Sequence, residues 1–204
     1  VNESMTDALN GMSGSSKIAL GVVLGLMMCF DLGGPVNKVA YGFATAGLSA
    51  AGTAMDAPQL KIMAAVMAAG MVAPLALALA TTVAPKLFSV PERENGKAAW
   101  LLGASFISEG AIPFAAADPI RIIIASTIGS SATGALVMFF GSTLLAPHGG
   151  IWVLPLIGQP LLFVLALAVG VAITAALVVL LKALAARRRY ETRTCQVCGK
   201  LFEG

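Results

Sequence analysis

Long apolar stretches separated by short polar breaks run along most of the chain, and this pattern predicts helices that cross a membrane. The stretches 60–83, 120–145 and 160–181 are each apolar over a length sufficient to cross the hydrocarbon core, which takes about 20 residues. The stretch 17–30 is also apolar but shorter. The stretch 39–54 is too weakly hydrophobic to predict a span by itself.

The composition supports a membrane environment. Of the 204 residues, 58% are hydrophobic and only 11% are charged, whereas soluble domains carry about 25% charged residues. The segment 122–181 contains no Asp, Glu, Lys or Arg. The net charge of +3 comes mostly from the arginines at 187–189, which follow the last apolar stretch as a cytoplasmic flank does. We therefore expect contact with membrane lipid and no nucleic-acid partner.

The distribution of basic residues predicts a hairpin that enters the membrane and returns on the same side. The segment 86–97 has the composition of a charged loop, and its basic residues favour the cytoplasmic side, together with the arginine tail. Two spans, 120–145 and 160–181, separate these cytoplasmic segments, so the apolar segment 98–117 has to return to its own side. The expected fold class is an all-α integral membrane protein, a bundle of transmembrane helices with broken helices and at least one re-entrant hairpin. This pattern is typical of a transporter binding site.

A carboxylate lies inside this predicted hairpin, in the sequence ISEGAIPFAAADPIRIIIAS. A charge at membrane depth costs at least a few kcal/mol, so Glu109 is a candidate functional residue. An ionised carboxylate only accepts hydrogen bonds, and sugar hydroxyls are donors that it can hold. Gly110 and Pro113 suit the non-helical tip of the hairpin. The structural alternative is that Glu109 lies near the interface or pairs with Arg121.

A second break, DLGGPVNK at 31–38, interrupts the apolar pattern because its two glycines and proline cannot continue a regular helix. Asp31 either caps a helix that starts at Pro35 or reaches a ligand. Asn37 and Lys38 follow in the same break. We expect Lys38 to extend its ammonium toward the interface or to pair with Asp31.

Three more polar residues lie between the later apolar stretches. Asp118 precedes Pro119 as an N-cap would, three residues before Arg121, so we expect this pair to be structural. His148, the single histidine, lies in the turn PHGG. It either donates a hydrogen bond to a sugar oxygen or lies in a polar loop.

The cysteines and the known catalytic motifs add little chemistry. Cys29 lies in an apolar segment and is expected to be a packing residue. Cys195 and Cys198 form one C-x-x-C pair, which supplies two of the four ligands that zinc needs. The sequence has no P-loop, nucleophile elbow or paired metal motif, so we expect no cofactor and no ATP-driven pump.

Three motifs in order give the chain a specific resemblance to a known family. The sequences FDLGGPVNKVAYGFA (30–44), ISEGAIPFAAADPIRIIIAS (107–126) and APHGGIWVL (146–154) resemble the membrane subunit, enzyme IIC, of the fructose-specific bacterial phosphotransferase system. The likeness runs from about residue 8 to 182 and includes the opening ALNGMSGSSKIALGVVLGLMM. The chain looks like the C-terminal half of that permease.

The resemblance implies a homodimer in which one half is a scaffold and the other holds sugar between helices and two re-entrant hairpins. Glu109 falls on the sugar-binding glutamate of the second hairpin. Related sugar branches also use a histidine of the first hairpin, and no histidine precedes Glu109 here. The implied partners are a fructose-like sugar and the enzyme IIB and IIA domains or subunits. The motif CQVCGK does not resemble the phosphorylated cysteine motif of enzyme IIB.

The expected function is a membrane permease component of a phosphoenolpyruvate-dependent phosphotransferase system. It would bind and translocate fructose, or a related hexose or hexitol, coupled to phosphorylation by enzyme IIB, as a multi-pass protein of the bacterial inner membrane. Whether it counts as an enzyme is left open, because it has no phosphorylatable cysteine or histidine motif. The alternatives are an ion- or proton-coupled secondary transporter and a non-functional truncated fragment.

The expected organisation has three parts. Residues 1–16 form a polar loop or a lead-in from a missing N-terminal half, 17–182 the membrane domain, and 183–204 a cytoplasmic basic tail. We expect no catalytic and no metal-binding residue. The expected substrate-binding residues are Glu109, Ser108, Gly110, Asp31, Asn37 and His148, and those with a structural or secondary role are Asp118, Arg121 and Pro113.

Overall fold

The computed structural model describes residues 17–50 and 57–201, and the side chains up to Arg187, so the expected lead-in at 1–16 lies outside the described residues. The described chain is almost entirely helical, as expected. Its elements are α2 (Lys17–Phe30), α3 (Pro35–Ala50), α4 (Pro58–Val83), η1 (Pro85–Leu87), α5 (Val90–Ala104), η2 (Ser108–Ala111), α6 (Ile112–Ala117), α7 (Pro119–Phe140), β1 (Thr143–Leu144), η3 (Gly150–Leu156), β2 (Ile157–Gly158) and α8 (Pro160–Leu201).

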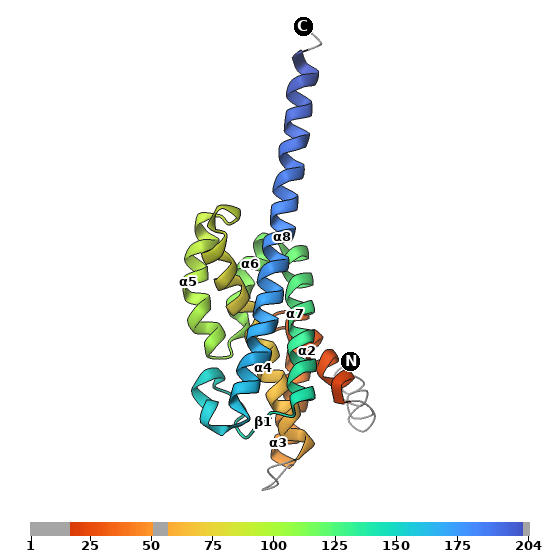
Figure 1. Cartoon of the computed structure of the whole chain (residues 1–204), viewed down its shortest axis with the longest axis vertical. Helices are drawn as coiled ribbons and strands as arrows, with labels where there is room; N and C mark the ends of the chain where they lie inside the picture. The colour runs from red at the N-terminus through yellow and green to blue at the C-terminus, as the bar shows by residue number, and fades with distance from the viewer. Residues whose placement is uncertain (1–16, 51–56, 202–204) are drawn as a thin grey trace.

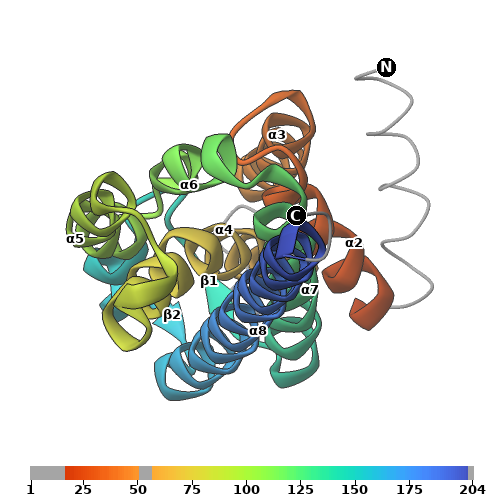
Figure 2. The same cartoon turned by 90° about the horizontal axis from the view of Figure 1, so that it is seen from above.

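Helix α4 occupies the centre of the bundle, with α5 on one side and α2 and α7 on the other (Figures 1 and 2). It is apolar around its whole circumference, and almost every residue from 60 to 80 is buried. A helix that is hydrophobic all round has to be enclosed by others or by lipid. Helices α4, α7 and α8 are long and apolar enough to cross a membrane, which confirms that the three predicted stretches form long apolar helices.

The predicted hairpin is present between α4 and α7. Helix α5 starts at the end of the bundle where α4 finishes and runs back alongside α4, and the chain then returns through η2 and α6 to the start of α7 (Figure 1). Gly96 of α5 lies against Thr81, and Gly103 lies against Leu75. The segment therefore enters and returns at the same end, and it reverses direction beside the middle of α4.

Two expected boundaries are wrong. The segment 86–97 is not a loop, because α5 already begins at Val90. A capping box starts this helix: the Ser89 hydroxyl accepts a hydrogen bond from the Glu92 backbone N–H, and the Glu92 carboxylate accepts one from the Ser89 N–H at 2.8 Å. Helix α8 also does not end near residue 182 but continues to Leu201, and it projects beyond the other helices (Figure 1).

Small residues bring α2 and α7 into close contact. A Cβ atom added at Gly21 would collide with the backbone of Gly134, and one added at Gly25 would collide with the backbone of Ser130. Backbones can approach this closely only where side chains are absent, as at small-residue interfaces between membrane helices. This contact fixes the height of α2 relative to α7, and thereby the position of the break that follows α2.

Candidate functional site

An interruption inside α4 is completed by the hairpin. Pro74 lies within α4 and has no N–H, so it cannot donate to the carbonyl four residues earlier, that of Gly70. The Ser108 hydroxyl of η2 donates a hydrogen bond to this carbonyl oxygen at 3.1 Å, and Ser108 is buried. Gly70 is at the midpoint of the 26-residue helix α4. The turn that carries Ser108 and Glu109 is thereby held halfway along a membrane-spanning helix.

The neighbouring carbonyl of α4 fixes two other helices at the same height. The Ala69 oxygen accepts a hydrogen bond from the Ser130 hydroxyl of α7 at 2.8 Å and from the Cys29 thiol of α2 at 3.6 Å. Cys29 is fully buried, which confirms that it is a packing residue. The C-terminal end of α2, and the break that follows it, therefore lie beside the midpoint of α4.

The break between α2 and α3 is organised by Asp31. Its carboxylate accepts hydrogen bonds from the backbone N–H of Val36 at 2.7 Å and of Asn37 at 3.1 Å, so the capping alternative is confirmed. The Asn37 side chain is buried and donates to the Met28 carbonyl at 2.6 Å. Of the two alternatives for Lys38, the salt bridge with Asp31 does not form. The side chains of Asp31 and Asn37 are thus engaged in holding the backbone of this break.

Glu109 lies against this break. A Cβ atom at Gly33 would be 2.8 Å from Oε1 of Glu109 and 3.0 Å from its Cδ, so the carboxylate rests directly on the Gly33 backbone. Gly33 has a φ of +105°, a conformation that favours glycine. Glu109 is exposed, and its carboxylate has no hydrogen-bond or ion-pair partner in the part of the chain that the structure describes. It is available to accept hydrogen bonds from a ligand.

The alternative partner of Glu109 is engaged elsewhere. Arg121 donates to the carboxylate of Asp118 at 2.7 Å, so the expected pairing of these two residues is confirmed and that of Arg121 with Glu109 is wrong. Asp118 occupies the N-cap position of α7, but its side chain makes no capping hydrogen bond. Pro113 stands in the first turn of α6, where a missing N–H costs nothing.

An aromatic row that the sequence analysis missed lies beside the hairpin tip. The ring of Phe106 is 6.0 Å from that of Tyr41 in α3 and 5.3 Å from that of His148. Phe106 is buried and has a positive φ of 64°, which is uncommon for a large side chain. Trp152 of η3 donates to the Ser105 hydroxyl at 3.1 Å. These contacts attach the segment carrying His148 to the tip that carries Glu109.

The expected substrate-binding residues therefore differ in whether their polar groups are already engaged within the protein. Ser108, Asp31 and Asn37 make hydrogen bonds that hold the backbone. Gly110 allows close packing, since a Cβ there would lie 3.0 Å from Leu102 Cβ. Gly33, Glu109 and the midpoint of α4 are far apart along the chain. The only sequence feature that suggests they could meet is that each lies at or near an interruption of the apolar pattern.

A second polar contact, between α5 and α8, was also missed. Lys182 donates to Glu92 at 2.6 Å, both side chains are about nine-tenths buried, and the ammonium lies 4.3 Å from the centre of the Phe88 ring. Desolvation acts to raise the pKa of Glu92, but the hydrogen bonds from Lys182 and Ser89 outweigh it and leave the pKa below its ordinary value. The residues are 90 positions apart, so no local pattern predicts the contact.

The fold defines a helical membrane protein in which chain interruptions meet beside the middle of α4, and comparison with known proteins agrees that it is a membrane protein. The chain is 55% identical over 177 residues to the "PTS system fructose-specific EIIB'BC component" of Vibrio cholerae. It is 47% identical over 182 residues to the fructose-specific EIIC component of Haloferax volcanii, and 43% identical over 178 residues to the "Fructose permease IIC component" of Bacillus amyloliquefaciens. These matches cover 85%, 89% and 87% of this chain. No family model and no solved structure matches it.

The chain is thus homologous, over most of its length, to part of the fructose-specific enzyme IIC components of the sugar phosphotransferase system, which confirms the resemblance found in the sequence. It spans 29% of the Vibrio protein, 47% of the Haloferax protein and 56% of the Bacillus amyloliquefaciens protein.

Proposed function

We propose that the chain is the sugar-binding and translocating part of a phosphotransferase-system permease for fructose or a related hexose or hexitol. The observation that carries the proposal is the position of the Glu109 carboxylate. It rests on the Gly33 backbone beside the midpoint of α4 and has no partner among the described side chains. A carboxylate held at membrane depth accepts hydrogen bonds from hydroxyl groups and is costly unless it serves a function.

Three chain interruptions meet around this carboxylate, as broken helices do in transporter sites. They are the Pro74 position in α4, the break 31–34 and the hairpin tip 105–111. His148 stands beside the same tip and supplies ring nitrogens that can donate or accept. In this proposal Glu109 holds the sugar, while Ser108, Gly110, Asp31 and Asn37 hold the backbone in the shape that presents it.

The partners and location follow from the same proposal. The names of the relatives contain B and, in Bacillus subtilis, A components, so enzyme IIB and IIA domains are the expected phosphoryl donors. The end of the bundle from which α8 projects carries Arg93 and Lys182, and we assign it to the cytoplasm. The complete permease is proposed to be a homodimer in the inner membrane and to span it several times.

The test is phosphoenolpyruvate-dependent phosphorylation of fructose by membranes that carry the permease containing this chain. Membranes are supplied with labelled fructose, phosphoenolpyruvate and the soluble phosphoryl carriers, and labelled fructose phosphate is measured. We expect its formation to require phosphoenolpyruvate, with mannitol and glucose as competitors to define the sugar. Accumulation of unmodified fructose that follows the proton gradient would instead favour a secondary transporter. The absence of both activities would favour a non-functional fragment.

A further inference from the structure

A cavity unrelated to Glu109 lies among residues at the end of the bundle from which α8 projects. Its volume is about 780 Å³, within the range of about 300–1,000 Å³ that is usual for ligand pockets. Five elements contribute to it: η1, α5, α6, α7 and α8. Its charged lining residues are Lys86, Glu92, Asp118, Arg121 and Lys182.

Three cations from three different elements face this cavity: Lys86 of η1, Arg121 of α7 and Lys182 of α8. Lys86 is exposed and makes no salt bridge with any residue that the structure describes. Arg121 uses one terminal nitrogen, Nη1, for Asp118. A guanidinium has five N–H donors, so Arg121 retains donors for a further acceptor.

The two carboxylates of the cavity are already neutralised. Glu92 accepts from Lys182 through Oε1 and from Ser89 through Oε2, so both of its oxygens are engaged. Asp118 accepts from Arg121 through Oδ2. The lining as a whole carries three positive and two negative side chains, which leaves one positive charge. An anion entering the cavity therefore meets an unpaired ammonium and a partly used guanidinium.

We propose that this cavity binds the phosphate group of a phosphate ester. Arginine matches phosphate oxygens with its fork of donors, and lysine adds a point charge. Leu87 and Ile120 give the cavity an apolar wall beside its cations, which suits an ester with a carbon portion. Basic pockets between membrane helices bind phospholipid head groups in this way, and a soluble phosphate monoester offers the same chemistry. The inference does not depend on sugar transport by Glu109.

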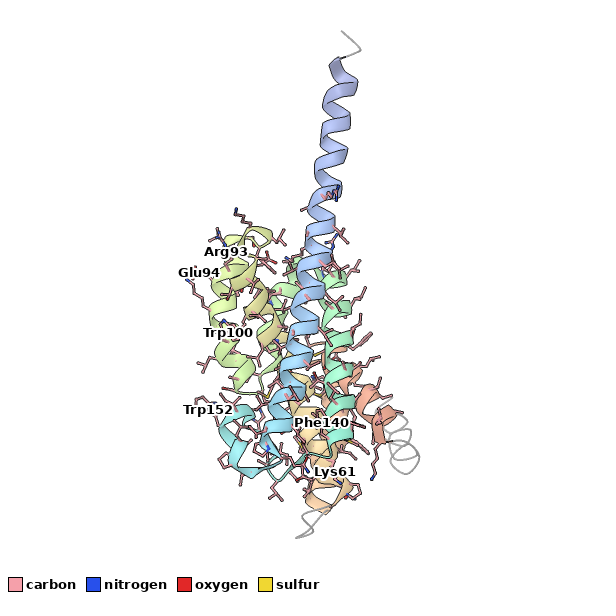
Figure 3. The ribbon with its side chains drawn as sticks, viewed as in Figure 1. Lys61, Arg93, Glu94, Trp100, Phe140 and Trp152 are labelled. Atoms are coloured by element: carbon pink, nitrogen blue, oxygen red, sulfur yellow. The ribbon has the colours of Figure 1, made fainter. Side chains whose placement is uncertain are left out.

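Two binding measurements on the purified chain separate these sources. Inorganic phosphate and glycerol 3-phosphate are titrated by calorimetry in a neutral detergent, and retained phosphatidylglycerol is counted by native mass spectrometry against phosphatidylcholine. Each is repeated on Lys86→Gln, Arg121→Gln and a matched control, Arg93→Gln. Arg93 is an exposed cation near the same end that does not line the cavity (Figure 3). Lys86→Gln breaks no salt bridge, so it tests the site even if Arg121→Gln perturbs folding.

We expect Lys86→Gln and Arg121→Gln each to weaken binding by about tenfold, the loss of one charge-assisted hydrogen bond, while Arg93→Gln changes it less than about twofold. If Lys86→Gln and Arg121→Gln weaken only the binding of the soluble phosphates, the natural ligand is a soluble ester. If they weaken only the retention of phosphatidylglycerol, the ligand is a lipid head group. Raising the salt concentration should weaken either one. The proposal is overturned if neither ligand binds saturably, or if Arg93→Gln loses as much affinity as Lys86→Gln.

Discussion

The hydroxyl of Ser108 donates to the carbonyl oxygen of Gly70, 38 positions earlier in the chain, at 3.1 Å. This carbonyl is the one that Pro74 deprives of its helical donor. An unpaired backbone carbonyl is costly at membrane depth, where no water replaces the lost donor. The proline that interrupts α4 and the serine that precedes Glu109 therefore act together to fix the hairpin at the centre of the bundle.

Replacing Ser108 by alanine should destabilise the protein, because the Gly70 carbonyl then has no donor. Hydrogen bonds between membrane helices contribute about 0.6 kcal/mol on average and up to about 1.7 kcal/mol, and we expect the upper part of this range. The measurement is thermal unfolding in detergent. The control is Ser49→Ala, whose exposed hydroxyl bonds only to the Thr45 carbonyl in its own helix. Equal unfolding temperatures for the two variants would contradict this account.

Gly33→Ala and Gly42→Ala form a matched pair. An added methyl group at Gly33 requires a positive φ of 105° and meets the Glu109 carboxylate at 2.8 Å, whereas one at Gly42 meets nothing within 4 Å. Gly42 lies inside α3, where alanine is favoured over glycine by about 0.5–1 kcal/mol. We expect Gly33→Ala to lower sugar affinity about tenfold by displacing one charge-assisted acceptor, and Gly42→Ala to leave it unchanged. Equilibrium fructose binding to the purified permease measures both.

The ion pair between Glu92 and Lys182 should make stability depend on pH. The pKa of Glu92 is lower in the folded protein than its ordinary value of 4.5, so the folded state favours the ionised form. This contribution is fully present above pH 4.5 and is lost as the pH falls through the lowered pKa. Glu92→Gln should therefore lower the unfolding temperature at pH 7, and the difference from the natural protein should shrink toward pH 3.

The control for this titration is Glu94→Gln. Glu94 pairs with Lys97 on the surface of α5, and both side chains are largely exposed. Such pairs contribute little to stability, so Glu94→Gln should have the same unfolding temperature as the natural protein at every pH. If the unfolding temperature of Glu92→Gln also equals that of the natural protein, the buried pair does not stabilise the contact between α5 and α8.

The main spans and the hairpin could be predicted because they depend on composition along a continuous stretch. The uncharged segment 122–181 is long enough to hold two spans, and the basic residues on either side favour a return of 98–117 to its own side. Glu109 could be singled out because a charge in an apolar membrane segment is costly, which makes it a candidate functional residue. For each of these the signal lies within one segment of the sequence.

The start of α5 was predictable and was missed. Ser89, with Glu92 three residues later and Pro91 between them, is the sequence pattern of a capping box, and the charges of 86–97 concealed it. The Gly33–Glu109 and Glu92–Lys182 contacts were not predictable, since each joins residues more than 70 positions apart. Their geometry depends on how the helices pack, and no local pattern records that packing.

The orientation of the bundle can be tested at Arg93, which is exposed near the beginning of α5 (Figure 3). We assign this end to the cytoplasm because it carries most of the basic residues, whereas Lys61 lies toward the opposite end (Figure 3). A cysteine at position 93 should react with an impermeant thiol reagent in inverted vesicles but not in intact cells. A cysteine at position 61, toward the opposite end, should show the reverse pattern of labelling. Strong labelling of position 93 in intact cells would reverse the assignment.

Glu109→Gln is the most direct test of the proposed sugar site. Glutamine keeps the shape of the side chain but removes its charge and replaces one acceptor oxygen with a donor. A hydrogen bond to a charged group contributes about 1.5–3 kcal/mol, so sugar binding should weaken by about ten- to a hundredfold. Folding should be retained, because the Glu109 carboxylate makes no ion pair with the residues that the structure describes.

The same variant separates sugar binding from proton coupling. If Glu109 were a coupling carboxylate, Glu109→Gln would still bind fructose, while accumulation and its pH dependence would disappear. Glu94→Gln makes the same chemical change on the surface of α5 and should leave both quantities unaltered. Fructose affinity of the purified permease and pH-dependent uptake by cells are therefore measured together for the two variants. Affinity that is lost only in Glu109→Gln assigns the carboxylate to the sugar, because a structural role would require a partner that Glu109 lacks among the described residues.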